Sequence, residues 1–411
     1  MARKITIILA LLVLFVAMPC GAVEIKAPKS ANIQVGALQV HPSVSIAETY
    51  SDNIYQSYDA KADESDYITT LSPGISLLLP LRRHSLRLGY RADIYKYSDL
   101  SENDYANQTA NGTLNFDFPG GLIFKISDTF RDITTQRKWK EQAAFSGSTD
   151  AYREKDHQTN DFNVMTKYRF VDRWAVEARY NNHQDEYDKS YDSGADFSRD
   201  MVGGSIYYSL TPKTDILLDY NYSDVDYDQA DTDDNENQMI YVGLSFDPTA
   251  KVQGYAKFGW AEKKFKQTLA TRDDKESIFS ALVNLGYVVT SFDKINLSGT
   301  RVIEEDSDNN ASYTDTKAYI GWTHVFAQNE KISMTTSLGY GNKNYSLADT
   351  DIDGTSKIRE DDSLTAGIGF GYIMQEWLKL ALNYSYTDND SNFKRYDYKE
   401  NRVFLNVTMQ Y

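Results

Sequence analysis

The chain has 411 residues, a formal net charge of −16 and a mean hydropathy of −0.54. A helical membrane protein is excluded because only the N-terminus carries a long apolar run, and so acidic a surface excludes nucleic acid as a partner. The length leaves open several soluble domains, a solenoid or one large barrel. Tyrosine is abundant, with 31 residues, and its apolar ring with a polar tip suits strands and membrane interfaces.

Residues 1–22 have the parts of a secretory signal peptide. A short basic start with Arg3 and Lys4 precedes an apolar stretch, and small residues end at Ala22. Cleavage after Ala22 would also remove Cys20, the single cysteine of the chain, and leave no thiol chemistry.

Two alternatives for this segment fit less well. Acylation of Cys20 would make a lipoprotein, but Ala17 and Pro19 are poor neighbours for such a site. An N-terminal membrane anchor would need a longer apolar run. We therefore expect a mature chain with a periplasmic lead-in over 23–36 and one folded domain over 37–411.

From residue 38 onward, apolar and polar residues alternate in runs that predict β-strands, because successive side chains of a strand point to opposite faces. The run 85–97 is the most regular, with Leu86 and Leu88 on one face and Arg87 and Arg91 on the other. We count 18 such runs, at residues 38–50, 67–79, 85–97, 107–118, 122–133, 161–170, 174–183, 201–210, 216–222, 238–246, 252–260, 277–289, 294–302, 316–326, 331–340, 364–373, 378–386 and 402–411.

The last run places Val403, Leu405, Val407 and Met409 on one face and stops at Tyr411. A terminal aromatic residue after alternating apolar residues resembles the C-terminal signature of bacterial outer-membrane β-barrels. By itself, this run could also be an edge strand of a soluble sheet.

The connections between the runs alternate in length. Those after even-numbered runs are tight turns, whereas those after odd-numbered runs are mostly long and acidic, for example 134–160, 184–200, 223–237 and 341–363. An up-and-down outer-membrane barrel has short periplasmic turns, long external loops and an even number of strands. A soluble sandwich or propeller has no reason to separate loop lengths in this way. The sequence therefore predicts an all-β, antiparallel transmembrane barrel of about 18 strands in outer-membrane lipid.

The apolar rows are expected to face lipid, so the opposite rows would line the lumen. These rows mix both signs of charge with amides, and such a wall faces water in a porin-sized barrel. It suits a hydroxylated or anionic polymer that slides past weak, repeated hydrogen bonds. Alternatively, the charges only pair with one another and keep the lumen wet. The candidate lumen-lining residues are Arg87, Arg91, Asp93, Lys167, Arg169, Glu177, Arg179, Lys257, Lys317, Lys379 and Arg402.

Signals for catalysis are weak. The five histidines have no zinc-type spacing, and no G-x-S-x-G motif is present. His183 and Asp185, at the external end of a predicted strand, are the one candidate pair for acid–base chemistry, and a polar pair at the base of a loop is the simpler interpretation. We therefore expect no enzymatic activity.

One external loop fits a calcium-binding pattern. Asp349, Asp351, Asp353, Gly354 and Glu360 match D-x-D-x-[DN]-G-x5-E, in which alternate carboxylates and a final bidentate glutamate converge on one hard cation. Calcium at this loop is the one cofactor hypothesis. A solvated acidic loop is the alternative, because strands and not helices are expected to flank the segment.

The first predicted strand carries a recognisable stretch. Residues 40–55 read VHPSVSIAETYSDNIY, and this pattern resembles the opening of the β-barrel porin 2 family of outer-membrane proteins. The resemblance implies a conduit for exopolysaccharide or capsular polysaccharide that works with periplasmic export and co-polymerase proteins. Two alternatives stay open: a general or solute-specific diffusion porin, and a plugged surface or adhesion barrel that acts through its acidic external loops.

Overall fold

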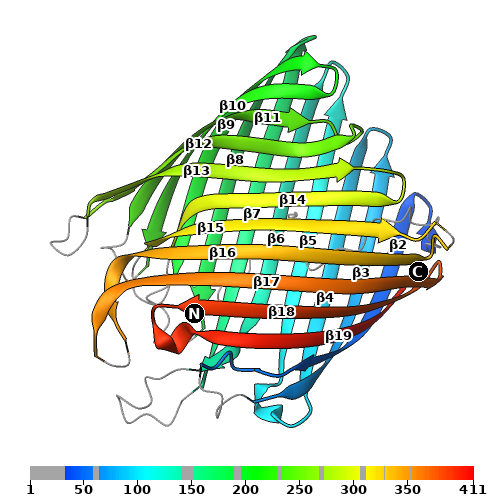
Figure 1. Cartoon of the computed structure of the whole chain (residues 1–411). Helices are drawn as coiled ribbons and strands as arrows, with labels where there is room; N and C mark the ends of the chain where they lie inside the picture. Colours follow the sequence, from blue (N-terminus) through cyan, green and yellow to red (C-terminus); the bar gives the residue numbers. More distant parts are fainter. Residues whose placement is uncertain are drawn as a thin grey trace, which may run out of the picture.

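The computed structural model describes residues 33–58, 64–139, 152–188, 196–228, 234–267, 273–305, 312–327, 329–351 and 354–411. They form one antiparallel sheet of 19 strands, and all but the first close into a barrel (Figure 1). Strands that follow one another in the sequence are neighbours in the wall, and β19 pairs with β2 to complete the circle. The prediction of an 18-stranded up-and-down barrel is confirmed. In the described part of the chain, no helix has the length and apolar character needed to cross a membrane.

The strands of the barrel wall are β2 (Leu38–Ser51), β3 (Asp66–Leu81), β4 (His84–Tyr97), β5 (Tyr105–Phe118), β6 (Leu122–Trp139), β7 (Tyr152–Val171), β8 (Trp174–Tyr187), β9 (Phe197–Thr211), β10 (Thr214–Tyr227), β11 (Asn235–Phe246), β12 (Val252–Phe265), β13 (Lys275–Val288), β14 (Asp293–Glu305), β15 (Ser312–Val325), β16 (Ile332–Thr350), β17 (Ser356–Gln375), β18 (Leu378–Ser391) and β19 (Tyr398–Gln410). The short strand β1 (Ile33–Val35) lies in the expected lead-in and forms a hairpin with β2. Two 3-10 turns, η1 (Ser101–Asn103) and η4 (Lys394–Tyr396), lie between strands.

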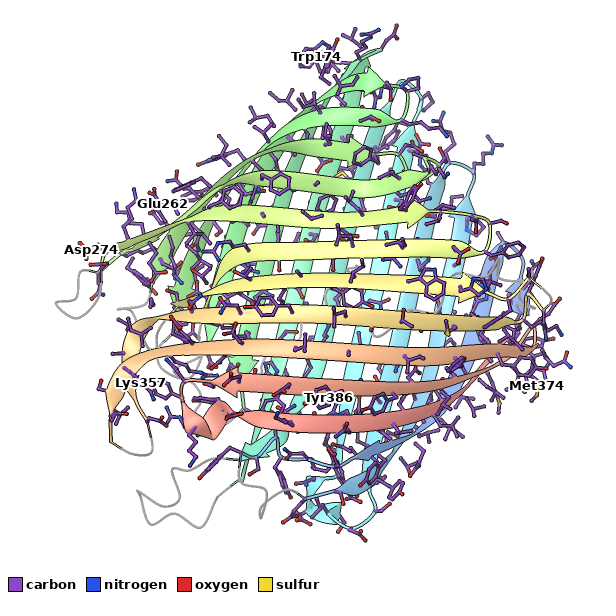
Figure 2. All side chains as sticks on the ribbon, viewed as in Figure 1. Trp174, Glu262, Asp274, Lys357, Met374 and Tyr386 are labelled. Carbon is purple, nitrogen blue, oxygen red and sulfur yellow. The ribbon has the colours of Figure 1, made fainter. Side chains whose placement is uncertain are left out.

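The two ends of the barrel differ as the connection lengths predict. The short turns lie together at one end, with Met374 beside one of them, and the long hairpins at the other end carry Glu262, Asp274 and Lys357 (Figure 2). The chain closes the barrel at the short-turn end, where the amide of Tyr411 donates to the carbonyl of Pro42 at 3.0 Å. The short-turn end is the periplasmic one in an outer-membrane barrel.

Several strands run further toward the external end than the sequence predicts. The segment 341–363, expected to be a long loop, is mostly paired strand, because β16 continues to Thr350 and β17 starts at Ser356. Strand β7 likewise starts nine residues before the predicted boundary at 161. The expected boundaries were wrong here because these extensions are rich in polar residues, and their few apolar residues, such as Leu347 and Ile358, do not form a regular apolar row.

The outer face is the apolar one. Residues such as Ile46, Leu71, Leu218, Phe258 and Leu405 are exposed there in the isolated chain, as expected for side chains that contact lipid. Toward the external end, outward tyrosines donate to polar groups on neighbouring strands, as Tyr340 does to Asp362 and Tyr180 to Asp200. Rings with their hydroxyls held at this height form the aromatic girdle of a membrane boundary.

The inner wall as the candidate functional site

All eleven candidate lumen residues lie on the strand face opposite the apolar rows. Directly paired residues of neighbouring strands share a face, so the register carries this face around the barrel; Arg87, for example, is opposite Thr113 and Lys379 is opposite Thr408. This face is the concave one, because side chains on it reach strands that are not neighbours. Arg179 on β8 contacts Asp219 on β10, and Lys257 on β12 contacts the same carboxylate.

Asp219 is the centre of the densest polar network on this wall. Its side chain is 1% exposed and is shared by Arg179 and by Lys257, whose ammonium lies 2.6 Å away. Arg179 also donates to Glu177 at 2.6 Å and to Ser205 at 2.8 Å. Two cations are thus neutralised by two carboxylates across five strands, and each buried charge has a partner.

Two tyrosines lie against this network. The ammonium of Lys167 is 3.6 Å from the ring centre of Tyr207, whose hydroxyl donates to Glu177 at 3.1 Å. Tyr241 shares a hydrogen bond of 2.9 Å with Ser280 and has Lys257 near its ring. Both rings are buried, with exposed fractions of 8% for Tyr207 and 1% for Tyr241, so they pack beneath the charged network, and cation–π contacts hold them in place.

The other predicted candidates divide into paired and unpaired charges. Arg91 is 2.6 Å from Asp93, Lys317 binds Asp315, and Arg402 binds Glu400. Arg169 is 3.9 Å from Asp215 and so is only loosely paired. Arg87 and Lys379 have no ion pair with any residue that the structure describes. The simpler of the two sequence-based interpretations, mutual pairing, thus fits most but not all of these charges.

A second aromatic and charged cluster was not among the candidates. Arg359 on β17 pairs with Asp361 at 2.5 Å, and its guanidinium lies 3.2 Å from the ring centre of Tyr396 and 4.5 Å from that of Tyr345. The sequence predicts long loops at these residues, and a residue in a loop has no predicted face. The alternation of Lys357, Arg359 and Asp361 was the available signal.

The stretch over residues 40–55, which includes most of β2, forms hydrogen bonds with β19 at the external mouth. We call Asp52 and Asn53, which form these bonds, the latch. Asp52 accepts from the backbone and side-chain amides of Asn401 on the last strand, each at 2.7 Å. Asn53 donates to the carbonyls of Ser57 and Lys399, each at 3.0 Å. These residues join the first strand and its loop to the last strand, so the motif stabilises the seam of the barrel.

The residues that follow the latch turn into the lumen. Ile54 and Tyr55 are fully buried against the inward-facing Ile68 and Tyr97, and the hydroxyl of Tyr55 accepts from Asn103 in η1 at 3.0 Å. The neighbouring connection is tied down as well. Hydrogen bonds from Lys96 and from the amide of Tyr97 hold the pKa of Asp104 below its usual value. The first two external connections therefore form a small packed shelf on the inner side of the mouth.

The histidines form pairs other than the expected one. His183 contacts Asp161 at 2.8 Å, and Asp185 contacts His157 at 2.7 Å. Each imidazole is held by a carboxylate of the neighbouring strand. Within the part of the chain that the structure describes, neither histidine forms a hydrogen bond with a serine or cysteine that could act as a nucleophile. His183 and Asp185 are therefore not a pair, and the simpler interpretation of polar residues near the base of a loop fits the geometry.

The calcium motif folds as a hairpin whose two sides are strands. Asp349 is opposite Lys357, so Glu360 lies three residues further along β17, about 10 Å away at the usual rise of a strand. Asp351 contacts the ammonium of Lys357 at 3.2 Å. Asp353 and the side chain of Asp349 lie outside the described residues, and the residues that are described contain no group of three metal-ligating side chains. Calcium binding stays a prediction.

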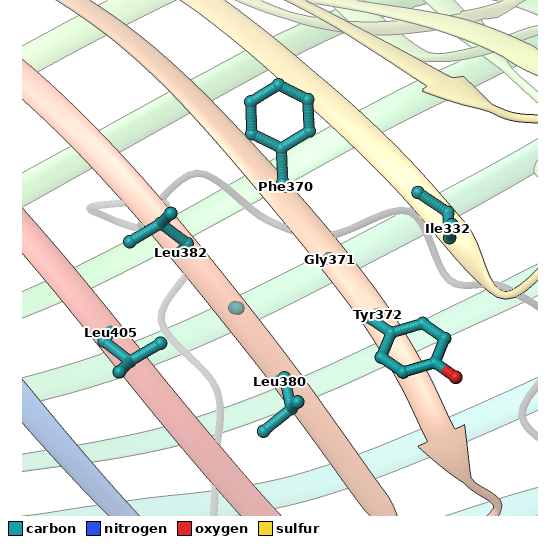
Figure 3. A pocket seen from close by; sticks show the side chains of 8 residues that line it. Ile332, Phe370, Gly371, Tyr372, Leu380, Leu382 and Leu405 are labelled. Atoms are coloured by element: carbon teal, nitrogen blue, oxygen red, sulfur yellow. The ribbon is translucent and has the colours of Figure 1, made fainter.

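The outer face has an apolar pocket of about 220 Å³ over β16 to β19 (Figure 3). Phe370 and Tyr372 on β17 and Leu382 on β18 surround it, together with Leu405 on β19. Because its lining is apolar and lies in the lipid-facing rows, this pocket suits an acyl chain and takes no part in the inner-wall site.

Comparison with known proteins gives a family and a set of distant structures. The family model described as "Putative beta-barrel porin 2" matches residues 28–411. Among solved structures, OccAB4 of Acinetobacter baumannii is 11% identical with a TM-score of 0.47, covering 92% of this chain and 99% of that one. The outer membrane protein OpdK of Pseudomonas aeruginosa is 10% identical with a TM-score of 0.46, covering 90% and 99%. No curated protein sequence matches this chain.

Proposed function

Because this chain belongs to the β-barrel porin 2 family of outer-membrane barrels, we propose that it is a non-enzymatic conduit through which an exopolysaccharide or capsular polysaccharide leaves the cell. The observation that carries the proposal is the composition of the inner wall. A guanidinium stacks on the half-buried ring of Tyr396, and the ammonium of Lys257 lies near Tyr255, an inward-facing residue that is 38% exposed. Sugars offer hydroxyls to polar groups and C–H faces to rings, so such a wall provides many weak contacts.

Because most charges of the inner wall are already ion-paired, they favour passage of a polymer and not its tight binding. Arg91, Arg179, Lys257 and Arg402 already have carboxylate partners, so a passing polymer gains little from any one of them. A conduit needs contacts that are favourable enough for entry and weak enough for release. Periplasmic export and co-polymerase proteins would deliver the chain to the short-turn end.

A diffusion porin is the second candidate function, favoured by the porin family to which the chain belongs. The two functions differ in the size of the cargo and in whether the pore is open at rest. The packed shelf formed by Ile54, Tyr55 and Asn103 lies on the inner side of the external mouth, a position that favours a conduit with a restricted opening.

The experiment is to measure surface polysaccharide on cells that lack the gene and on cells in which the gene is restored. Loss of surface polymer, with unchanged growth on small solutes, supports export. Unchanged polymer together with slower uptake of small solutes would replace export by the porin function. If neither changes and the purified barrel carries no current in a bilayer, a plugged surface barrel acting through its acidic loops becomes the better explanation.

A further inference from the structure

The periplasmic end of the inner wall holds basic side chains without carboxylate partners. Arg87, Lys125, Lys294 and Lys379 each lie within the first four residues of a strand that begins at a short turn, on β4, β6, β14 and β18. Register places them on the inner face, with Lys125 opposite Asn115 and Lys294 near Gly286. None of them has an ion pair with a described residue.

Basic residues of the inner wall differ in their ion pairing according to their height along the barrel. Further toward the external end, Arg131, Arg179, Lys257, Arg359 and Arg402 each contact a carboxylate. At the periplasmic end of β7, the cations Lys167 and Arg169 are each 3.9 Å from the nearest carboxylate, which is a loose contact. Charge compensation is therefore close at these external positions and weak at the four periplasmic positions and on β7, although Arg83 in the turn between β3 and β4 does pair with Asp117 at 2.8 Å.

The unpaired cations are spread along one arc of the wall, and none of the four lies on β8 to β13. In barrel order they run from β14 through β18 and β4 to β6, with the loosely paired cations on β7. We call Arg87, Lys125, Lys294 and Lys379 the basic ring. A solute that enters from the periplasm along the arc from β14 to β6 passes the basic ring first.

The electrostatic consequence follows from confinement. Like charges that line an aqueous passage with low-dielectric walls raise the local concentration of counter-ions, and rings of Arg and Lys select anions in pores. Their reach is about 8 Å at physiological ionic strength. The acidic external loops oppose re-entry of anions from outside, so the two ends of the molecule differ in the sign of charge that they attract.

We propose that the basic ring is an entry site for the carboxylate, sulfate or phosphate groups of an anionic glycan. This inference rests on the proposed function and narrows its substrate class. Neutral sugars would pass the ring without a specific contact, whereas each acidic group can exchange water for a charge-assisted hydrogen bond with an arginine or lysine. The contacts stay exchangeable because Arg87 and Lys379 are exposed to solvent.

The test uses the purified full-length barrel in planar bilayers under a potassium chloride gradient. The wild type is compared with Arg87→Gln/Lys125→Gln/Lys379→Gln and with Lys264→Gln, a control that removes an exposed charge from the outer face of β12. We expect an anion-selective reversal potential in the wild type and in Lys264→Gln, and loss of this selectivity in the triple variant. A cation-selective wild type, or a triple variant equal to the control, would overturn the basic ring as an entry site.

The substrate class is tested with oligogalacturonate as the acidic probe and maltoheptaose as the neutral one, added to the short-turn side. Charge-assisted hydrogen bonds are worth enough that oligogalacturonate should block at least about tenfold more weakly in the triple variant, with no change for maltoheptaose. Heat-modifiable gel migration checks that each variant has folded.

If the purified barrel is closed and carries no current, calorimetric titration with oligogalacturonate in detergent tests whether the basic ring binds acidic groups. Heats that are equal for the wild type and the triple variant would overturn the inference. Failure of the export function itself is recognised separately, by unchanged surface polysaccharide on cells without the gene.

Discussion

At the level of single residues, Asp219 is the carboxylate on which the inner-wall network depends. Its side chain is nearly inaccessible, and two cations from β8 and β12 share it. Arg91 and Asp93 show the opposite case, since the guanidinium is 61% exposed and water can replace its partner. The burial of each ion pair therefore indicates how much it contributes to the free energy of unfolding, whereas the sequence alone does not distinguish the two pairs.

Replacing Asp219 with asparagine should lower the free energy of unfolding by about 1–3 kcal/mol, because Lys257 then keeps a partly buried charge without a partner. Urea unfolding of the barrel in phospholipid vesicles measures this change. Asp93→Asn is the matched control and should cost less than about 1 kcal/mol, because its partner is solvated. Equal losses for the two variants would contradict the ranking by burial.

The calcium hypothesis is also decided at single residues. If the motif binds calcium, the ion should raise the thermal unfolding temperature of the wild type and not that of Asp351→Ala, because this carboxylate is one of the expected ligands. The contact between Asp351 and Lys357 competes with the ion, so binding should be weak and salt-dependent. Calorimetry with calcium chloride is the direct measurement, and heat no greater than dilution would reject the site.

At the level of elements, the pairing of β11 with β12 requires a glycine. Gly254 has a φ of 101°, a conformation that favours glycine, at the periplasmic start of β12. Further along, a Cβ on Gly259 would lie 1.8 Å from the carbonyl oxygen of Ile240 and 2.8 Å from the Cα of Tyr241. The two backbones approach too closely at this point for any side chain.

Gly259→Ala should therefore destabilise the barrel by about 1–3 kcal/mol, because the strands must move apart and lose ladder hydrogen bonds. Gly299→Ala on β14 is the control, since its Cβ would be 3.5 Å from the nearest atom, the carbonyl oxygen of Lys317. This control should be neutral or slightly stabilising. Urea unfolding of both variants is the measurement, and an unaffected Gly259→Ala variant would show that the close approach relaxes without cost.

At the level of the whole molecule, closure of the barrel gives the backbone groups of the two end strands, β2 and β19, hydrogen-bond partners in each other. Strands β19 and β2 pair along nine residues of each, and the latch at Asp52 and Asn53 extends this seam at the external end. In lipid an open edge would leave backbone groups without partners. Closure also separates two surfaces, one apolar and facing lipid, the other polar and concave.

Orientation is a property of the whole barrel and can be checked with single cysteines. Removal of residues 1–22 would leave no other thiol in the chain, so Asp274→Cys and Lys213→Cys give one label site each. A membrane-impermeant maleimide on intact cells should label position 274, at a long hairpin, and not position 213, at a short turn, because the short turns face the periplasm. Permeabilised cells should show labelling at both. Labelling of only position 213 on intact cells would reverse the orientation.

The sequence by itself determined the architecture and the faces of its strands. Alternation assigned Arg87 and Leu88 to opposite sides, and the parity of loop lengths distinguished a closed membrane barrel from a soluble sheet. Both signals are local, because period-two patterning follows from the geometry of a single strand.

Only the tertiary structure decided which charges are compensated. Arg179, Asp219 and Lys257 meet across five strands because the wall is curved, and no spacing in the sequence encodes that curvature. Arg87 and Lys379 occupy inward positions of the same alternating pattern in the sequence, yet neither forms an ion pair with a residue that the structure describes. The inward turn of Ile54 and Tyr55 was hidden for the same reason, since their burial partners lie on other strands.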